Sequence, residues 1–323
     1  MRENPFSPGP GLAGRMAAQL GTFTAEQAYA AGHNHKEVQL LRAAKILHSV
    51  RRGVYALREP YLALGPMEKH RVDTQALLLS VAAPAALSHE TAAVWSGLEL
   101  LTPVLDLLHL TRPELQASRR EAGVHHHPGS LPAGHVHEVG GVRQTTAARI
   151  AVDIARTRDF PAGLAAVDSA RRSGATEEQV RNVLFYCASW PGARGASRAV
   201  ACGDERSANP GESLSRAVLL DAGLEPSGLQ VLVRDSQGFI GYGDFGWLPH
   251  RVIGEFDGRS KYGMAPDSPA DALWREKRRE DRLRALGFEV VRWTWADLLV
   301  PSKVPALVRE ALARATVRSM SIA

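Results

Sequence analysis

Three strand patterns joined by short turns are the feature that most constrains how this chain folds. They cover residues 228–234, 239–248 and 251–258, and Asp235-Ser236-Gln237-Gly238 and Pro249-His250 separate them. Turns this short join neighbouring antiparallel strands, so the pattern predicts a three-strand meander.

Helix patterns flank this meander on both sides. One covers Pro210 to Gly223, and a charged one begins near Ala270 and ends at Gly287. A fourth strand pattern over residues 288–295 and a final helix follow. The order helix, three strands, helix, strand, helix predicts an α+β domain over residues 206–323.

The second turn determines how two acidic residues of the meander face each other. If Pro249-His250 is a two-residue hairpin loop, Leu248 pairs with Arg251. The same register then places Asp244 opposite Glu255 on the neighbouring strand.

Asp257 adds a third carboxylate, because residues two apart in a strand project from the same face. Like charges across a ladder destabilise it, so either a cation or neighbouring Arg and Lys side chains must compensate. Oxygen ligands at this spacing suit Mg²⁺ or Mn²⁺. Such an ion lowers the pKa of a bound water and stabilises charge on a phosphodiester.

Residues 206–300 resemble the PD-(D/E)XK nuclease superfamily, and more narrowly the relatives of the very short patch repair endonucleases. The core of that superfamily is helix, three antiparallel strands, helix, strand. The segments that carry the resemblance are Glu212-Ser213, Gln230, Gly243-Asp244-Phe245, Glu255-Phe256-Asp257-Gly258, Lys261-Tyr262, Glu276 to Asp281 and Val291 to Thr294.

The resemblance implies roles for individual acidic residues. Asp244 matches the first acidic position of the motif, Glu255 the second, and Glu212 a helix carboxylate that supports the metal. It thus implies that Glu212, Asp244 and Glu255 bind Mg²⁺ or Mn²⁺ in the centre of a DNA endonuclease, with Asp244, Glu255 and Asp257 as catalytic residues.

One position departs from the superfamily motif. A lysine should stand two residues after Glu255, and Asp257 occupies that place. A lysine from elsewhere would have to steady the attacking water or the transition-state charge, and Lys261 and Lys277 are the candidates. Alternatively, Asp257-Gly258 is mainly a turn that ends the strand, its carboxylate capping local amides.

The charged helix near residues 275–284 allows two interpretations. Its basic and acidic residues alternate, which is typical of a solvated helix held by ion pairs. The other interpretation is phosphate contact beside the acidic patch. Trp293 and Trp295, on one face of the last strand pattern, are expected in the core rather than stacked on bases.

The first sixty residues predict a small helical module that ends in a hairpin. The patterns are helices over 11–20, 24–32 and about 34–46, then strands over 47–50 and 54–57 around a turn at Arg51-Arg52-Gly53. Thr24 and Gln27 fit a capping box at the start of the second helix. Three helices followed by a hairpin is the order of a winged helix-turn-helix, whose recognition helix lies in the major groove of DNA.

Polar side chains of the third helix and the hairpin tip are the expected DNA contacts. They are Lys36, Gln39, Arg42, Lys45, Arg51 and Arg52.

This module resembles the N-terminal domain of AbiEi-type antitoxins, which repress transcription in toxin–antitoxin systems. The whole chain resembles actinobacterial proteins in which such a domain is fused to the nuclease-like domain. Of the net charge of +5, residues 1–60 supply +4, as expected for a module that binds a polyanion. Docking to a protein, or a solvated basic face, is the alternative.

Residues 61–205 predict a mixed α/β region that connects and positions the end modules. The helix patterns cover 72–83, 88–98, 145–156, 160–173 and 177–188, and a strand pattern covers 105–111. Five histidines suggest a metal site; they are His125, His126, His127, His135 and His137. Because no carboxylate or cysteine joins them at ligand spacing, and Pro128-Gly129 is turn-like, we expect a solvated loop or strand edge.

Cysteine usage and hydropathy favour a cytoplasmic protein without a membrane partner. Cys187 and Cys202 do not make a disulfide framework, so inert thiols and a reducing compartment are expected. The N-terminus has no apolar stretch of signal-peptide length. The apolar run over residues 98–110 is too short to span a bilayer.

Two functions from different classes fit these patterns. The first is a Mg²⁺-dependent DNA endonuclease, a hydrolase that its winged helix brings to double-stranded DNA. The second is an AbiEi-like antitoxin and transcriptional regulator whose nuclease fold is catalytically silent and docks a cognate toxin or a second copy. The acidic constellation favours the first, and the missing lysine favours the second. An RNA-cleaving toxin is less favoured, because aromatic RNA-binding signatures are lacking.

Overall fold

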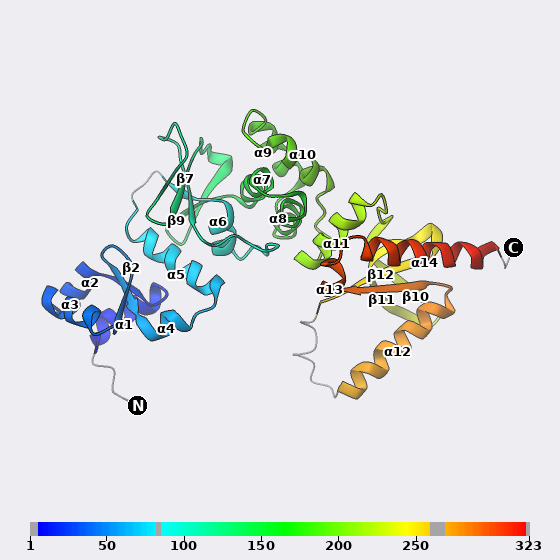
Figure 1. Cartoon of the computed structure of the whole chain (residues 1–323), viewed down its shortest axis with the longest axis horizontal. Helices are drawn as coiled ribbons and strands as arrows, with labels where there is room; N and C mark the ends of the chain where they lie inside the picture. The colour runs from blue at the N-terminus through cyan, green and yellow to red at the C-terminus, as the bar shows by residue number, and fades with distance from the viewer. Residues whose placement is uncertain (1–5, 82–84, 259–268, 321–323) are drawn as a thin grey trace. The chain divides into compact units, whose positions relative to one another are not determined.

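The structure is a computed structural model that describes residues 6–81, 85–258 and 269–320 (Figure 1). Contacts divide the chain into two compact units. The first holds residues up to Leu98 and Thr102–Asp153, and the second holds Glu99–Leu101 and residues from Ile154 onward. The division at Asp153 falls inside the predicted connecting region 61–205. Helices and several sheets occur together, which confirms the predicted mixed α+β class.

The first unit begins with three helices and a three-stranded antiparallel sheet of order β1-β3-β2. The elements are α1 (Gly9–Ala18), β1 (Thr22–Thr24), α2 (Ala25–Ala30), α3 (His35–Ala43), β2 (Leu47–Arg51) and β3 (Val54–Leu57). The three helices and the hairpin predicted for this segment are present. Strand β1 is an addition, since three residues give too short a pattern to detect.

Capping and a small apolar core hold this segment together. The predicted capping box is present: Thr24 Oγ1 accepts from Gln27 N at 3.1 Å, and Gln27 Oε1 accepts from Thr24 N at 2.9 Å. Asn34 and Glu37 cap α3 in the same way. The core residues are Phe6, Leu12, Met16, Phe23, Ala28, Val38, Leu47 and Tyr55. Val38 is the buried residue of α3 and Leu41 is partly buried against the same core, so the other side chains of that helix are exposed.

A six-stranded sheet forms the rest of the first unit, with the order β6-β7-β5-β4-β9-β8. The elements are α4 (Arg58–Ala63), α5 (Pro66–Leu78), β4 (Ala86–Leu87), α6 (His89–Ser96), β5 (Leu108–Arg112), β6 (Arg119–Glu121), β7 (Val124–Pro128), η1 (Ala133–His135), β8 (Val136–Val139) and β9 (Val142–Thr145). Strand β7 runs parallel to β5 and antiparallel to β6. The prediction of a solvated loop or strand edge at His125–His127 was therefore wrong, because these residues lie on an interior strand.

The second unit starts with four helices. They are α7 (Ala147–Thr157), which crosses the division at Asp153, α8 (Phe160–Arg172), α9 (Glu177–Tyr186) and α10 (Ala193–Cys202). The predicted helices α7, α8 and α9 are present, and α10 is additional. Helix α8 is buried along most of its length, and it carries Asp168 into the interior.

Residues 206–320 form a four-stranded sheet with helices on both faces. The elements are α11 (Pro210–Asp221), β10 (Gly228–Asp235), β11 (Gly238–Trp247), η2 (Leu248–His250), β12 (Val252–Asp257), α12 (Pro269–Ala285), β13 (Glu289–Thr294), α13 (Trp295–Leu298) and α14 (Lys303–Met320). The strand order is β10-β11-β12-β13, with β12 and β13 parallel. This is the element order that the sequence predicts. Leu219 of α11 and Val308 of α14 pack on one face, and Leu283 of α12 packs on the other.

The two tryptophans near the last strand have different positions. Trp293 is buried in β13 and donates its indole N–H to Ser215 Oγ at 2.8 Å. Trp295 is not on the strand, contrary to prediction, but begins α13. Thr294 ends the strand because its backbone N–H and its hydroxyl both donate to Asp297 Oδ2 at 2.8 Å, which caps the new helix.

We expect removal of the buried carboxylate of Asp168 to destabilise the second unit strongly. It accepts from Asp204 N at 2.8 Å, Ser213 Oγ at 2.8 Å and Arg216 Nη2 at 2.5 Å, so it joins α8 to α11. Replacing Asp168 by Ala leaves the buried Arg216 cation without this partner and should lower the free energy of unfolding by about 3–5 kcal/mol. Urea denaturation followed by circular dichroism measures the change.

The matched control is Asp221→Ala, which removes the exposed pair with Arg198 at 2.7 Å. Exposed pairs contribute little, so this variant should lose at most about 1 kcal/mol. Equal losses in the two variants would contradict the role given to Asp168.

Candidate functional site

The turn between β11 and β12 sets the register of the acidic residues. Trp247 pairs with Val252 and Phe245 with Gly254, and Arg251 N donates to Leu248 O at 3.0 Å across the turn. This is the predicted register. Regular pairing ends at Phe245 and Gly254, so Asp244 and Glu255 are the next residues on the two strands.

The Asp244 carboxylate contacts amide groups of both neighbouring strands. Its Oδ2 accepts from the backbone N of Phe256 at 2.8 Å, and its Oδ1 accepts from Gln230 Nε2 at 3.3 Å. Both contacts orient the carboxylate through amide groups. Asp244 is thereby fixed where the strands β11 and β12 separate.

Gln230 of β10 joins Asp244 to Glu212. Its Nε2 also donates to Glu212 Oε2 at 3.1 Å, so one amide nitrogen serves two carboxylates. Glu212, in the first turn of α11, is buried and further accepts from Ala208 N at 2.7 Å and Asn209 Nδ2 at 2.8 Å. The structure thus brings together Glu212 and Asp244, two of the three predicted metal ligands.

The backbone of Gln230 is unusual. Its φ of +47° lies in the left-handed region, which costs a residue with a Cβ about 1–2 kcal/mol. The neighbouring residues Leu229 and Val231 pair regularly with Phe245 and Gly243. A strained residue persists where its surroundings hold it, and such residues cluster at functional sites.

Glu255 is held by two arginines. Its Oε1 accepts from Arg279 Nη2, and its Oε2 accepts from Arg292 Nε at 2.9 Å. Arg279 also donates to Glu276 at 3.0 Å, and Arg292 to Glu280 at 3.1 Å, so the pair belongs to a network between α12 and the sheet. The sequence predicted that either a metal cation or neighbouring Arg and Lys side chains balance the charge of the acidic residues. For Glu255, two arginine side chains do so.

This network determines the charge of Glu255. Burial alone would raise the pKa of Glu255, but the hydrogen bonds and charges of Arg279 and Arg292 outweigh it, and the pKa is lowered from its usual value. The carboxylate is therefore ionised near neutral pH and balanced by two guanidinium groups.

Two of the remaining predicted catalytic residues, Asp257 and Lys277, are exposed. Asp257 is exposed at the end of β12, where it pairs with Thr294 of β13. Lys277 is exposed on α12, its Nζ 5.7 Å from the centre of the Trp274 ring. Lys261 lies outside the described residues.

The charged helix α12 forms ion pairs both within itself and across to the sheet. Arg284 pairs with Glu280 one turn away, as in a solvated helix. Arg282 instead reaches the β10–β11 turn and donates to both oxygens of Asp235, at 2.6 and 2.7 Å. Phosphate contact by this helix stays a prediction.

The predicted DNA contacts form an exposed surface of α3 and the hairpin. Lys36, Gln39, Arg42, Lys45 and Arg52 are exposed, and Arg51 is half-buried at the end of β2. Arg42 donates to Gln39 Oε1 at 2.9 Å and lies over the Tyr55 ring, 5.6 Å from its centre. These contacts preorganise the polar side chains of one helix face.

Of the histidines that the sequence groups together, His125 and His127 stay together, with ring centroids 3.9 Å apart, whereas His135 and His137 have other contacts. His135 lies in η1 with Nδ1 3.4 Å from Arg149 Nη1, and His137 on β8 lies 3.0 Å from Gln144 Nε2. His127 instead meets His89 and His109, which sequence reasoning missed because they are remote along the chain. Among the described residues, these three form the one group of His, Cys, Asp or Glu whose ligand atoms all lie within 4.8 Å of one another.

Comparisons with known proteins give relatives of unknown function. No model of a known protein family matches the chain. The uncharacterized Mycobacterium tuberculosis proteins MT2308 (strain CDC 1551 / Oshkosh) and Rv2248 (strain ATCC 25618 / H37Rv) are each 28% identical over 267 residues, which is 81% of this chain and 91% of each relative. The crystal structure of the Mycobacterium tuberculosis protein RV2827C shares 14% identity at a TM-score of 0.39, over 70% of this chain and 87% of that one. Within the described ranges, no helix is both long and apolar enough to cross a membrane.

The lowered pKa of Glu255 makes a prediction about stability and pH. A carboxyl group whose folded pKa lies below its unfolded value stabilises the fold above the unfolded pKa, and this contribution is lost as pH falls through the folded pKa. The stability difference between the wild type and Glu255→Gln should therefore be largest near pH 7 and shrink below about pH 4.5. Urea denaturation of both proteins at several pH values measures it. A difference that is constant from pH 7 to pH 3 would contradict the arginine clamp.

Proposed function

We propose that this chain binds double-stranded DNA through its first sixty residues and cleaves it with a Mg²⁺- or Mn²⁺-dependent endonuclease centre in residues 206–323. The observation that carries the proposal is the Gln230 amide, which lies within hydrogen-bond distance of both Glu212 and Asp244. A strained backbone at Gln230 and two carboxylates from separate elements meet at one point.

The metal fits part of the predicted ligand set. Glu212 and Asp244 supply hard carboxylate oxygens at one place, which is the ligand type that Mg²⁺ and Mn²⁺ prefer. When bound there, the ion would supply a polarised water and charge stabilisation for phosphodiester hydrolysis. Gln230 orients both carboxylates toward the shared position, and the burial of Glu212 strengthens its electrostatic interactions.

The element order of residues 9–57 supports DNA as the partner. Three helices and a hairpin in a sheet of order β1-β3-β2 match the order of a winged helix. The third helix then presents Lys36, Gln39 and Arg42 to the major groove, and Arg52 at the hairpin tip meets a phosphate.

A second candidate function is a DNA-binding regulator whose nuclease fold is catalytically silent, as in an antitoxin. The observation in its favour is the arginine clamp on Glu255, because a carboxylate balanced by Arg279 and Arg292 is a poorer metal ligand. Asp257 in the place of the motif lysine points the same way. Both candidate functions require DNA binding, but only the endonuclease cleaves DNA. A cleavage assay therefore distinguishes them.

The endonuclease proposal predicts cleavage that depends on both bridged carboxylates. Full-length protein should nick plasmid and cut oligonucleotide duplexes in Mg²⁺ or Mn²⁺, and Glu212→Gln and Asp244→Asn should each reduce the rate by at least about 100-fold, because each removes an oxygen charge from the ion. Gel electrophoresis of labelled duplex measures the rates.

The matched control is Glu289→Gln, a carboxylate on β13 of the same sheet that pairs with Arg314 and Arg318. Its cleavage rate should stay within a few-fold of wild type. If the wild type binds duplex but cuts nothing in either ion, the endonuclease proposal fails and the silent regulator stands.

The DNA-binding proposal predicts a change in salt dependence. The double variant Lys36→Ala/Arg52→Ala should bind duplex more weakly, and the slope of log K against log salt should fall in magnitude by about 2, because two cations that neutralise phosphate charge are lost. Fluorescence anisotropy across a salt series measures the slope. The control Arg181→Ala/Arg194→Ala removes the same charge from exposed sites on α9 and α10. If both double variants reduce the slope equally, the change reflects a general loss of positive charge, and the proposed DNA-binding surface is contradicted.

A further inference from the structure

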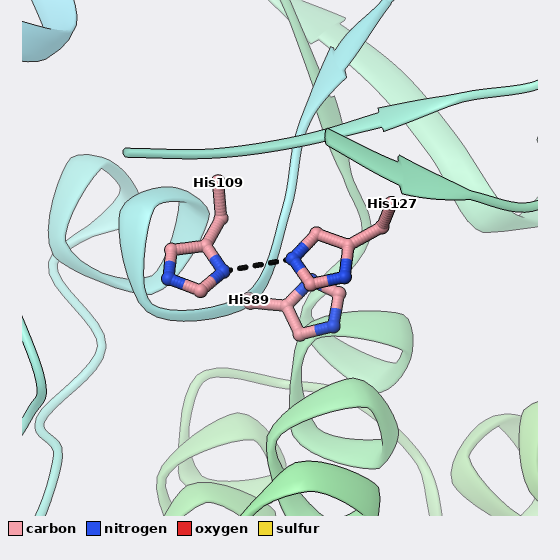
Figure 2. Close-up of side chains that lie close together, drawn as sticks. All are labelled: His89, His109 and His127. Carbon is pink, nitrogen blue, oxygen red and sulfur yellow. Dashed lines mark hydrogen bonds between the residues drawn. The ribbon is translucent and has the colours of Figure 1, made fainter. Parts of the chain in front are cut away.

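Three imidazoles from three separate elements converge in the first unit (Figure 2). His89 begins α6, His109 lies on β5 and His127 lies on β7. His109 Nδ1 and His127 Nε2 are 2.9 Å apart, and the rings of His89 and His127 stack with centroids 3.8 Å apart. One ring nitrogen of each histidine lies within 4.8 Å of the other two.

The fold determines this convergence. Strands β5 and β7 are parallel neighbours in which His109 pairs with His125 and Thr111 with His127, so His109 and His127 project from the same face. His89 approaches from the start of the helix with φ of +52°, in the left-handed region. Ser88 Oγ lies 3.0 Å from His89 Nδ1 and does not cap the helix, so it holds the ring in place.

The rings of His109 and His127 are neutral near pH 7, which is the form that binds metal. Burial, and then the charge of His125, lowers the pKa of His109 to about 4. Burial, and then the neighbouring histidines, lowers the pKa of His127 as well. In the contact between His109 Nδ1 and His127 Nε2, one nitrogen donates its hydrogen and the other accepts.

Two buried carboxylates surround the rings. Glu90 is 3% exposed and places Oε2 4.0 Å from His109 Nε2, on the opposite side of the ring from Nδ1. Asp153 is fully buried, pairs with Arg149 at 2.8 Å and acts on the charge of His127. A carboxylate behind a histidine ring is the arrangement that orients metal-bound imidazoles and raises their basicity.

We propose that His89, His109 and His127 bind a divalent transition-metal ion of the zinc type. Imidazole nitrogen suits Zn²⁺, Ni²⁺ and Cu²⁺ and does not suit Mg²⁺, so this centre is distinct from the acidic one in residues 206–323. The ion lies between His109 Nδ1 and His127 Nε2, and the hydrogen shared there moves to the other nitrogen of the ring that donates it. The stacked His89 ring turns so that its nitrogen points to the ion. Three protein ligands leave a fourth position for water.

The proposal is independent of DNA cleavage and has its own experiment. Isothermal titration of full-length, chelator-treated protein with ZnCl₂ should show one tight site, and saturating Zn²⁺ should raise the melting temperature by about 5–10 °C. His109→Gln and His127→Gln should each weaken binding by at least about 100-fold. X-ray absorption of the zinc-loaded wild type should show imidazole nitrogen at about 2.0–2.1 Å.

The matched control is His137→Gln, which removes a histidine of the same sheet that lies on β8 and contacts Gln144. It should bind Zn²⁺ like the wild type. The proposal is overturned if the wild type has no stoichiometric site, or if both cluster variants bind as tightly as the wild type. Should the variants fail to fold, the wild-type X-ray absorption decides, because zinc held without imidazole nitrogen also overturns it.

Discussion

A carboxylate removed from water must find a cation or several N–H donors, and the second unit satisfies this requirement in three different ways. Asp168 is paired with Arg216 and hydrogen-bonded by Asp204 N and Ser213 Oγ. Glu255 is held between Arg279 and Arg292. Glu212 and Asp244 share the Gln230 amide. Each solution connects elements that are far apart in sequence, so the packing of helices on the sheet depends on them.

The kind of partner determines what each carboxylate can do. A guanidinium cancels the charge that it binds, so Asp168 and Glu255 serve structure first. An amide orients a carboxylate without cancelling its charge, because it carries only a dipole. The Gln230 amide therefore brings two carboxylates together, whereas Arg279 and Arg292 balance the charge of Glu255. This juxtaposition is why we propose the cation at Glu212 and Asp244 and give Glu255 a supporting role.

The sequence predicted local structure correctly where the hydrogen bonds that determine it join residues close together in the chain. The hairpin register followed from Pro249-His250, and the capping box followed from Thr24 and Gln27, because the hydrogen bonds involved join residues a few positions apart. Trp295 was misplaced because a second capping box at Thr294 overrides the strand pattern. The clamp on Glu255 joins β12 to α12 and β13, and no periodicity encodes which arginine reaches it.

The histidine cluster likewise depends on contacts between residues remote in sequence, which local patterns do not predict. His125, His126 and His127 are conspicuous in the sequence, yet alternation along β7 sends only every second side chain to one face. The partners of His127 come from residues 18 and 38 positions earlier, His109 and His89, through parallel pairing of β5 with β7 and a left-handed residue at the start of α6. The resulting centre offers nitrogen, and the Glu212–Asp244 centre offers oxygen. Because ligand type biases the choice of metal, the two proposed centres would favour different ions, a zinc-type ion at the imidazoles and a magnesium-type ion at the carboxylates.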